Sequence, residues 1–271
     1  MKYAKVLTVA GSDSGGGAGI EADLKTIERL GGYGMAAVTA VTAQNTRGVH
    51  GIWELPAEAV ARQIGAVAED LGIDAAKCGM LGSSAIVRET ARALARYPGL
   101  PLVVDPVMRA KGGGRLLAPD AEAALREELL PLATLVTPNL PEAEALVKAS
   151  VRSRREREDA ARRILDMGAG AVLLKGGHGT GEEIEDLLYD GESFHVFRGL
   201  RVDTPHTHGT GCTLSAAAAT GLGQGLGLRD AVERAIRYVQ AAIRHAPGYG
   251  GGQGPLGHHA GQDAWTGRCM P

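Results

Sequence analysis

The sequence predicts an α/β protein in three layers, with a central, mainly parallel sheet and helices on both faces of it. Apolar runs of strand length alternate with helical patterns along most of the chain, as in sheets built from strand–helix–strand units. Polar residues and glycines follow several of these strands directly, at Gly11, Asp105, Asn139 and Lys175. Ligands in such sheets bind beyond the carboxyl ends of the strands, so we expect these positions to converge on one crevice.

Each expected element follows from the length and pattern of its apolar residues. Short apolar runs bounded by polar or glycine residues indicate strands at 6–10, 36–42, 75–78, 102–104, 134–136 and 171–174. Two further runs, 184–189 and 193–197, flank Asp190-Gly191, which is a strong hairpin signal. Longer amphipathic or small-residue runs indicate helices at 18–30, 57–71, 84–95, 121–130, 155–167, 213–226 and 228–245.

Composition excludes several classes of protein. The formal net charge of -2 provides no basic surface for nucleic acid, and no apolar run approaches the ~20 residues that span a membrane. The three cysteines Cys78, Cys212 and Cys269 are odd in number and widely spaced, unlike a disulfide framework or a zinc site. Because a strand-like segment begins at once, we expect no signal peptide and a cytoplasmic protein with reduced thiols.

The turn Gly209-Thr210-Gly211-Cys212, which opens a small-residue helical run, is the most informative stretch of the chain. A helix start leaves backbone N–H groups without partners and carries positive potential. Glycines let a phosphate approach that backbone closely. The same potential favours a thiolate, so we expect a lowered pKa for Cys212. An anion hole beside a potential base is what phosphoryl transfer to a hydroxyl requires.

A second glycine-rich loop, residues 11–19, follows the first strand. It contains Gly17-x-Gly19-x-x-Ala22, which fits the dinucleotide fingerprint. That fingerprint requires an acidic residue about 20 positions later to bind the ribose, and none occurs between Glu28 and Glu54. A nicotinamide-dependent oxidoreductase is therefore disfavoured, and the lysine-containing phosphate loop of common nucleotide-binding proteins is also absent.

Two polar segments follow later strands and have both functional and structural interpretations. Asp105 and Glu142 suit magnesium beside a polyphosphate, but Asn139 and Glu142 equally predict a helix cap with an acidic first turn. Lys175 is placed to reach a phosphate or to lie in solvent at a strand end.

Three other polar positions have structural interpretations that need no bound ligand. Asp23 is suited to stabilise a helix start. The Gln44 amide is suited to pair with a heteroaromatic ring edge or to cap a loop. His206-x-His208 offers two imidazoles and no clear fourth ligand, so a role without metal is favoured.

At this point the sequence resembles the hydroxymethylpyrimidine and phosphomethylpyrimidine kinases of thiamine biosynthesis, members of the ribokinase-like superfamily. The segments AGSDSGGGAGIEADLKT (10–26), TAQNT (42–46) and HTHGTGCT (206–213) carry the match, with DPVM (105–108) and NLPE (139–142) between them in order. The resemblance covers roughly the first 246 residues, and the combination is far more specific than any single motif.

The resemblance implies a kinase that uses ATP and Mg²⁺. It phosphorylates 4-amino-5-hydroxymethyl-2-methylpyrimidine and then the monophosphate. It also implies a role for each matching residue. Residues that would line the pyrimidine pocket are Gly11, Asp23, Gln44, Met80 and Val107. Residues that would act on the phosphates are Gly209, Thr210 and Gly211 as an anion hole, Asn139 and Lys175 as phosphate ligands, and Asp105 and Glu142 at magnesium. Cys212 would occupy the position of the catalytic base.

Two departures from the family pattern accompany the match. Ser14 stands where many relatives carry proline, a change in turn rigidity. In the Gly- and His-rich C-terminal tail, residues 247–271, the segment GQGPLGH (252–258) resembles the family's glycine–proline ending, and the second departure is the unusual segment beyond it. We expect residues 1–246 to form the kinase domain, the first part of the tail to close over a ligand, and residues 261–271 to be disordered.

The family further implies a homodimer, with a small-molecule substrate and no nucleic-acid or membrane partner. Pyridoxal kinase of the same superfamily is the nearest alternative, because pyridoxal also presents a hydroxymethyl group on a nitrogen heteroaromatic ring. A nucleotide-binding regulatory module without catalysis is a further alternative. The combination of Asp105, Glu142, Lys175 and Cys212 argues against that module.

Overall fold

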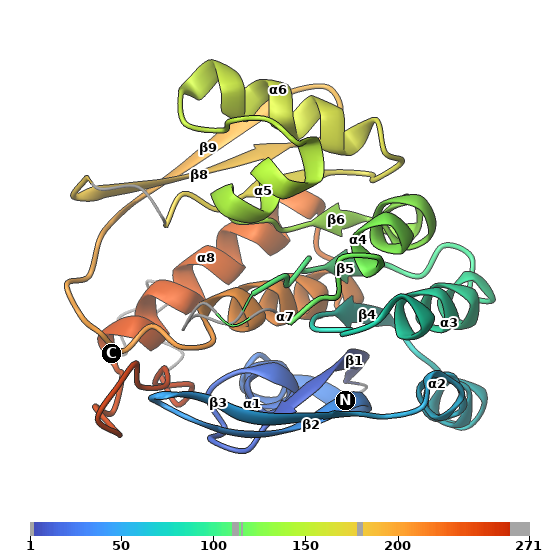
Figure 1. Cartoon of the computed structure of the whole chain (residues 1–271). Helices are drawn as coiled ribbons and strands as arrows, with labels where there is room; N and C mark the ends of the chain where they lie inside the picture. Colours follow the sequence, from blue (N-terminus) through green and yellow to red (C-terminus); the bar gives the residue numbers. More distant parts are fainter. Residues whose placement is uncertain (1–2, 110–113, 115, 178–180, 261–271) are drawn as a thin grey trace.

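The computed structural model describes residues 3–109, 114, 116–177 and 181–260, and it contains the three predicted layers (Figure 1). Within these residues the strands form one sheet in the order β3-β2-β1-β4-β5-β6-β7-β8-β9. The strands are β1 (Ala4–Asp13), β2 (Gly32–Asn45), β3 (Gly48–Glu54), β4 (Ala75–Cys78), β5 (Leu102–Val104), β6 (Leu135–Val136), β7 (Val172–Leu174), β8 (Glu183–Tyr189) and β9 (Phe194–Leu200). Among the described residues, no helix is both long and apolar enough to cross a bilayer.

The centre of the sheet is parallel and both of its edges are antiparallel. Strands β2, β1, β4, β5, β6 and β7 pair in parallel. At one edge β3 pairs antiparallel with β2, and at the other β8 and β9 form a hairpin against β7. The predicted hairpin around Asp190-Gly191 is therefore confirmed. The parallel strands β5, β6 and β7 contain only apolar residues because helices cover both of their faces.

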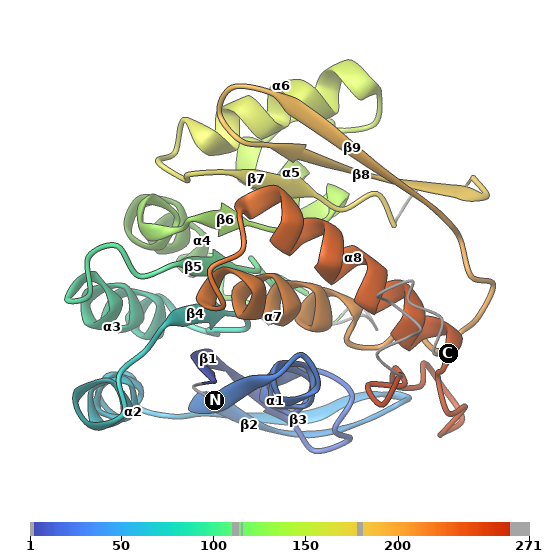
Figure 2. The same cartoon turned by 180° about the vertical axis from the view of Figure 1, so that it is seen from behind.

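Two hydrophobic cores lie on opposite faces of the sheet. Side chains alternate along each strand, so in β5 Leu102 and Val104 pack into one core and Val103 into the other. Figures 1 and 2, which view the molecule from opposite sides, show the two groups of helices. One face carries α2 (Ala57–Asp70), α3 (Ser84–Ala95), α4 (Ala121–Ala124), α5 (Leu140–Val147) and α6 (Arg154–Leu165), and the other carries α1 (Gly19–Arg29), α7 (Thr210–Gly223) and α8 (Leu228–Arg244).

The structure differs from the predicted elements in three places. Strand β3 was not predicted, because it contains two glycines and is largely exposed. The predicted helix at 121–130 consists of α4, a π-helical turn over Leu125–Leu129 and a 3₁₀ turn over Leu130–Leu132. Helix α5 begins after Asn139, whose side chain forms a capping box with Glu142, so the structural interpretation of that pair is confirmed.

The described part of the C-terminal tail, residues 247–260, folds back onto the domain (Figure 2). Gly257 N–H donates to the Ala242 carbonyl at the end of α8, and the Ala260 carbonyl accepts from Arg29 of α1. His208 N–H donates to the Gly254 carbonyl. The tail thereby contacts α1, α8 and the turn before α7. The predicted disorder at 261–271 falls outside the described residues.

Candidate active site

The two glycine-rich segments meet at the start of α7. Gly209 caps this helix in a left-handed conformation, with a φ of 85°. A Cβ atom there would lie 1.8 Å from the Gly17 carbonyl oxygen, so only glycine lets the first loop and the turn touch. Helix geometry leaves the N–H groups of Thr210, Gly211 and Cys212 without intrahelical acceptors, whereas Thr213 N–H already donates to the Gly209 carbonyl. The predicted helix start is thus present, and anion binding there stays a prediction.

A cluster of charged residues lies against this helix start. Lys175 Nζ donates to Asp105 Oδ1 at 2.8 Å and lies 4.0 Å from Glu142 Oε2. A Cβ atom on Gly211 would come within 3.1 Å of Asp105 Oδ2 and 3.2 Å of Lys175 Nζ. The structure therefore brings together strand-end residues from β5, β6 and β7 as the sequence predicts. Asn139 lies beside them, in a bridge with Lys175.

The charge of this cluster is unbalanced, with two carboxylates around one ammonium group. Burial raises the pKa of Glu142 to about 7, and the Asp105 carboxylate raises it as well, while Lys175 lowers it. The pKa of Lys175 is raised because the attraction of Asp105 and Glu142 outweighs the opposing effect of burial. The surplus negative charge suits a further cation. Among the described residues, however, no group of three His, Cys, Asp or Glu side chains is placed to hold a metal.

Cys212 lies half-buried in the first turn of α7. The pKa of its thiol is about 11, raised mainly by burial and also by the Asp23 and Asp105 carboxylates. The Lys77 ammonium and the Gly19 backbone N–H lower it only in part. The expectation that the helix start lowers this pKa is therefore wrong for the ligand-free protein. Desolvation and two nearby carboxylates outweigh the effects of Lys77 and the Gly19 N–H.

The sequence did not single out Lys77, which forms a buried ion pair with Asp23 beside this thiol. The Lys77 and Asp23 side chains are both 0% exposed, with Nζ and Oδ2 2.7 Å apart. Thr8 Oγ1 donates to the same Asp23 oxygen at 2.5 Å, while Oδ1 has no partner among the described residues. Asp23 is thus wholly buried, and its predicted contact with the pyrimidine stays a prediction.

Of the other predicted pocket residues, Gly11 and Met80 lie close together. A Cβ atom on Gly11 would approach Met80 Sδ to 3.2 Å, and the Met80 carbonyl accepts from Thr39 Oγ1. Val107 N–H donates to the Asp105 carbonyl in the turn after β5. Gln44 lines a cavity of about 360 Å³ together with His208 and Gly252. The substrate contacts predicted for these residues remain predictions.

The tail supports the first turn of α7 from behind. His258 is 5% exposed, and its Nε2 lies 3.0 Å from Thr213 Oγ1. Burial lowers the pKa of His258 to about 4, so the imidazole is neutral near pH 7 and forms a hydrogen bond with the Thr213 hydroxyl. Its carbonyl accepts from Tyr238 of α8. The residue after Cys212 is therefore anchored to the end of the chain, a contact that no local sequence pattern indicates.

Comparison with known proteins decides the family. A family model described as phosphomethylpyrimidine kinase matches residues 13–257. The chain belongs to this family. It is 47% identical to the hydroxymethylpyrimidine/phosphomethylpyrimidine kinase of Bacillus subtilis over 96% of each chain. It is 52% identical over 93% of its length to the thiamine biosynthesis bifunctional protein ThiED of Geobacter sulfurreducens, of which it spans about half, 52%.

A solved structure supports the fold. An ADP complex of the Bacillus subtilis pyridoxal kinase superposes with a TM-score of 0.89 at 38% identity, covering 96% of this chain and 98% of that one. The predicted three-layer ribokinase-like fold is confirmed, as is the assignment to the thiamine-biosynthesis kinases as a phosphotransferase. The ADP complex also supports the use of an adenine nucleotide by this fold.

Proposed function

We propose that this chain transfers the γ-phosphate of ATP to the hydroxymethyl group of 4-amino-5-hydroxymethyl-2-methylpyrimidine, and then phosphorylates the monophosphate to the diphosphate. One observation carries the proposal. The start of α7 presents free backbone N–H groups and carries the Cys212 thiol. Lys175, paired with Asp105, lies beside Gly211 in the same turn. This arrangement offers a proton acceptor, an anion hole and a phosphate-binding cation around one point.

The chemistry follows from these groups. The substrate hydroxyl oxygen attacks the γ-phosphorus, the bond from that phosphorus to the β–γ bridging oxygen breaks, and ADP leaves. Charge spreads over the oxygens of the transferring group. The N–H groups of Thr210 and Gly211 and the Lys175 ammonium stabilise that charge. The hydroxyl proton passes to the Cys212 thiolate, and Asn139 and Lys175 hold the remaining phosphates.

Magnesium fits the cluster at Asp105 and Glu142. Mg²⁺ binds through one or two carboxylates, retained waters and substrate phosphates, and these carboxylates carry surplus negative charge. Lys175 already contacts Asp105, which favours binding of the ion through its waters. When bound, Mg²⁺ would neutralise charge on the transferring phosphates.

The pKa of about 11 gives the role of Cys212 a direct test. If the thiolate is the base, kcat/KM of the wild type should rise with pH by about tenfold per unit across the neutral range, because kcat/KM reports the pKa of the free enzyme. Cys212→Ala should lower turnover by ~10²–10⁴-fold and abolish this slope. A folded Cys212→Ala protein with most of its turnover would remove Cys212 from this role.

Pyridoxal kinase remains the second candidate, because the ADP-bound pyridoxal kinase is similar over nearly the whole chain. A coupled assay of ATP consumption should offer the pyrimidine alcohol, its monophosphate and pyridoxal separately. We expect turnover of both pyrimidines and poor turnover of pyridoxal. Turnover of pyridoxal with an inert monophosphate would select the alternative instead.

We further propose that the protein is a cytoplasmic homodimer. An exposed apolar pair at the sheet edge supports the dimer, since Trp53 of β3 is 61% exposed and lies opposite the exposed Val41 of β2. Association through this edge would cover it. Light scattering should give twice the chain mass, and Trp53→Lys should give monomers. A wild-type monomer would refute the dimer.

A further inference from the structure

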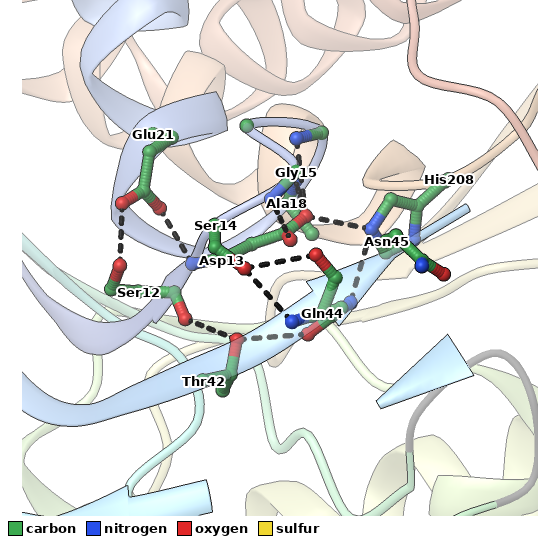
Figure 3. Close-up of polar contacts among 12 residues, drawn as sticks. Ser12, Asp13, Ser14, Gly15, Ala18, Glu21, Thr42, Gln44, Asn45 and His208 are labelled. Atoms are coloured by element: carbon green, nitrogen blue, oxygen red, sulfur yellow. Dashed lines mark hydrogen bonds and ion pairs between the residues drawn. The ribbon is translucent and has the colours of Figure 1, made fainter. Parts of the chain in front are cut away.

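A partly buried network joins the first glycine loop, the turn before α7 and the end of β2 (Figure 3). His208 Nε2 lies 2.8 Å from Asp13 Oδ2 and 3.2 Å from the Gln44 side-chain amide. The backbone of Gln44 is held by Ser14, whose hydroxyl accepts from Gln44 N–H and donates to its carbonyl. Ser14 thereby fixes the backbone of Gln44 through two hydrogen bonds.

The first step is to place the proton of His208. Asp13 is 3% exposed and accepts backbone N–H groups from Gly15, Gly17 and Ala18. Burial alone would raise the pKa of Asp13, but hydrogen bonds from His208 and the loop amides outweigh burial and lower it. Asp13 is therefore ionised at neutral pH, and an ionised carboxylate only accepts. Nε2 of His208 must carry a proton and donate it to Asp13.

The second step is to orient the Gln44 amide, whose oxygen and nitrogen exchange places by a half-turn of the terminal group. With the amide nitrogen toward His208, two N–H donors face each other at 3.2 Å. The amide oxygen then faces Thr42 Oγ1 at 3.4 Å, but that hydroxyl already donates to the Ser12 carbonyl at 2.8 Å. One half-turn removes both conflicts. The oxygen then faces the His208 N–H and shares its single proton with Asp13 in a three-centre hydrogen bond, and the nitrogen donates to Thr42.

We propose that His208, with its proton held by Asp13, is a positioning residue that fixes the Gln44 amide in this one orientation. Gln44 and His208 line the same cavity, so the amide presents an acceptor near His208 and a donor near Thr42. An aromatic ring with an exocyclic amino group beside a ring nitrogen offers the complementary pair. A ring with an oxo group beside a ring N–H offers the reverse pair, and a fixed amide rejects it. The inference rests on the proposed function and deepens it.

The test compares the aminopyrimidine alcohol with its 4-oxo counterpart in the wild type, His208→Leu and His208→Gln. A reversed ring leaves polar groups unpaired, and sites built for hydrogen bonding discriminate strongly. We expect the wild type to prefer the amino ring by at least about 100-fold in kcat/KM. His208→Leu should reduce this preference by about tenfold or more, mainly through the two KM values, because Gln44 can then turn.

His208→Gln is the matched control, because its amide can donate to both Asp13 and Gln44. It should retain most of the preference for the amino ring. Thr42→Val, which removes the other partner of the amide, should also weaken the preference. Thermal unfolding of each variant identifies loss of fold, and Thr42→Val keeps the test decisive if His208→Leu does not fold.

Undiminished preference in folded His208→Leu, or equal loss in His208→Leu and His208→Gln, would overturn the inference. Failure of the proposed function is a different result, because the wild type would then phosphorylate neither ring. Calorimetric binding of the two rings to the same variants measures the same preference without turnover. That measurement would still support or refute the role of His208.

Discussion

Two lysine–carboxylate pairs of nearly equal length differ in access and in charge balance. Lys77 and Asp23 are 2.7 Å apart and wholly buried, one charge against one. Lys175 and Asp105 are 2.8 Å apart, but Lys175 is 14% exposed and a second carboxylate, Glu142, lies 4.0 Å away. The attraction of carboxylates outweighs burial and raises the pKa of both lysines, so both remain charged.

The comparison teaches that bond length does not separate a structural ion pair from a working one. In the sealed pair, Lys77 with Asp23, neither side chain is exposed, so neither can take a new partner. We expect this pair to affect the stability of the protein and the electrostatic field around Cys212. In the open pair, Lys175 with Asp105, the lysine can leave its carboxylate to bind an incoming phosphate. The additional Glu142 carboxylate is then available to a cation. Four predictions test this division.

The largest effect is expected from Lys77→Met. It leaves Asp23 as an unpaired buried carboxylate and should lower the free energy of unfolding by about 3–5 kcal/mol, measured in urea. The double variant Lys77→Met/Asp23→Leu should recover most of this loss, because removing both charges of a buried pair is often neutral. A loss below about 1 kcal/mol in the single variant would mean that the pair is not sealed.

Lys175→Met should act on activity instead. We expect kcat/KM for the pyrimidine alcohol to fall by ~10²–10³-fold, comparable to the loss of one oxyanion donor. The free energy of unfolding should change by less than half of the Lys77→Met effect, since solvent reaches this pair. A loss of stability equal to that of Lys77→Met, with kinetics unchanged, would reverse the assignment.

Two glycine-to-alanine changes make a matched comparison of the space beside each pair. A Cβ atom on Gly79 would lie 2.6 Å from Lys77 Nζ, so Gly79→Ala should cost about 1–3 kcal/mol of unfolding free energy through overpacking. Gly211→Ala should keep or raise stability, because alanine favours a helix. It should nevertheless lower kcat/KM, since its methyl group occupies space between Asp105 and Lys175. Equal behaviour of the two variants would contradict the comparison.

The smallest effect concerns the surplus charge at the open pair. The folded pKa of Glu142, about 7, exceeds its ordinary value of 4.5, so the native state holds a proton that the unfolded chain has lost. Stability of the ligand-free protein should therefore fall as pH rises through this window, by at most about 1.4 kcal/mol per unit. Glu142→Gln should flatten the profile from pH titrations of chemical unfolding. If the slope of stability against pH is unchanged in Glu142→Gln, a group other than Glu142 causes it.

Local patterns in the sequence were sufficient for the strands and helices that form the core. Residues 75–78, 84–95 and 102–104 fold as predicted, to the residue, because burial on both faces or on one helical stripe leaves a strong periodic signal. Edge strand β3 lacked that signal. The convergence of Asp105, Glu142 and Lys175 followed from topology alone, because parallel strands end at the same edge.

Local sequence patterns could not predict the contacts between residues that lie far apart in the chain. Lys77 within an apolar strand gave no indication that Asp23, 54 positions away, would neutralise it. The predicted lowering of the Cys212 pKa was wrong for the same reason. The helix start is visible in the sequence, but burial and the carboxylates of Asp23 and Asp105 are not. The His208–Asp13 contact spans 195 positions and was equally hidden.

The docking of the tail has a consequence for the order in which the protein becomes active. Every strand of the sheet has left the ribosome before Gly254 and His258, which contact His208 and Thr213, are synthesised. A nascent chain can therefore complete its sheet while the pocket wall and the first turn of α7 still lack their last supports. Kinase activity would then appear only after residues 254–258 have been added, and chains that stop before them would be inactive.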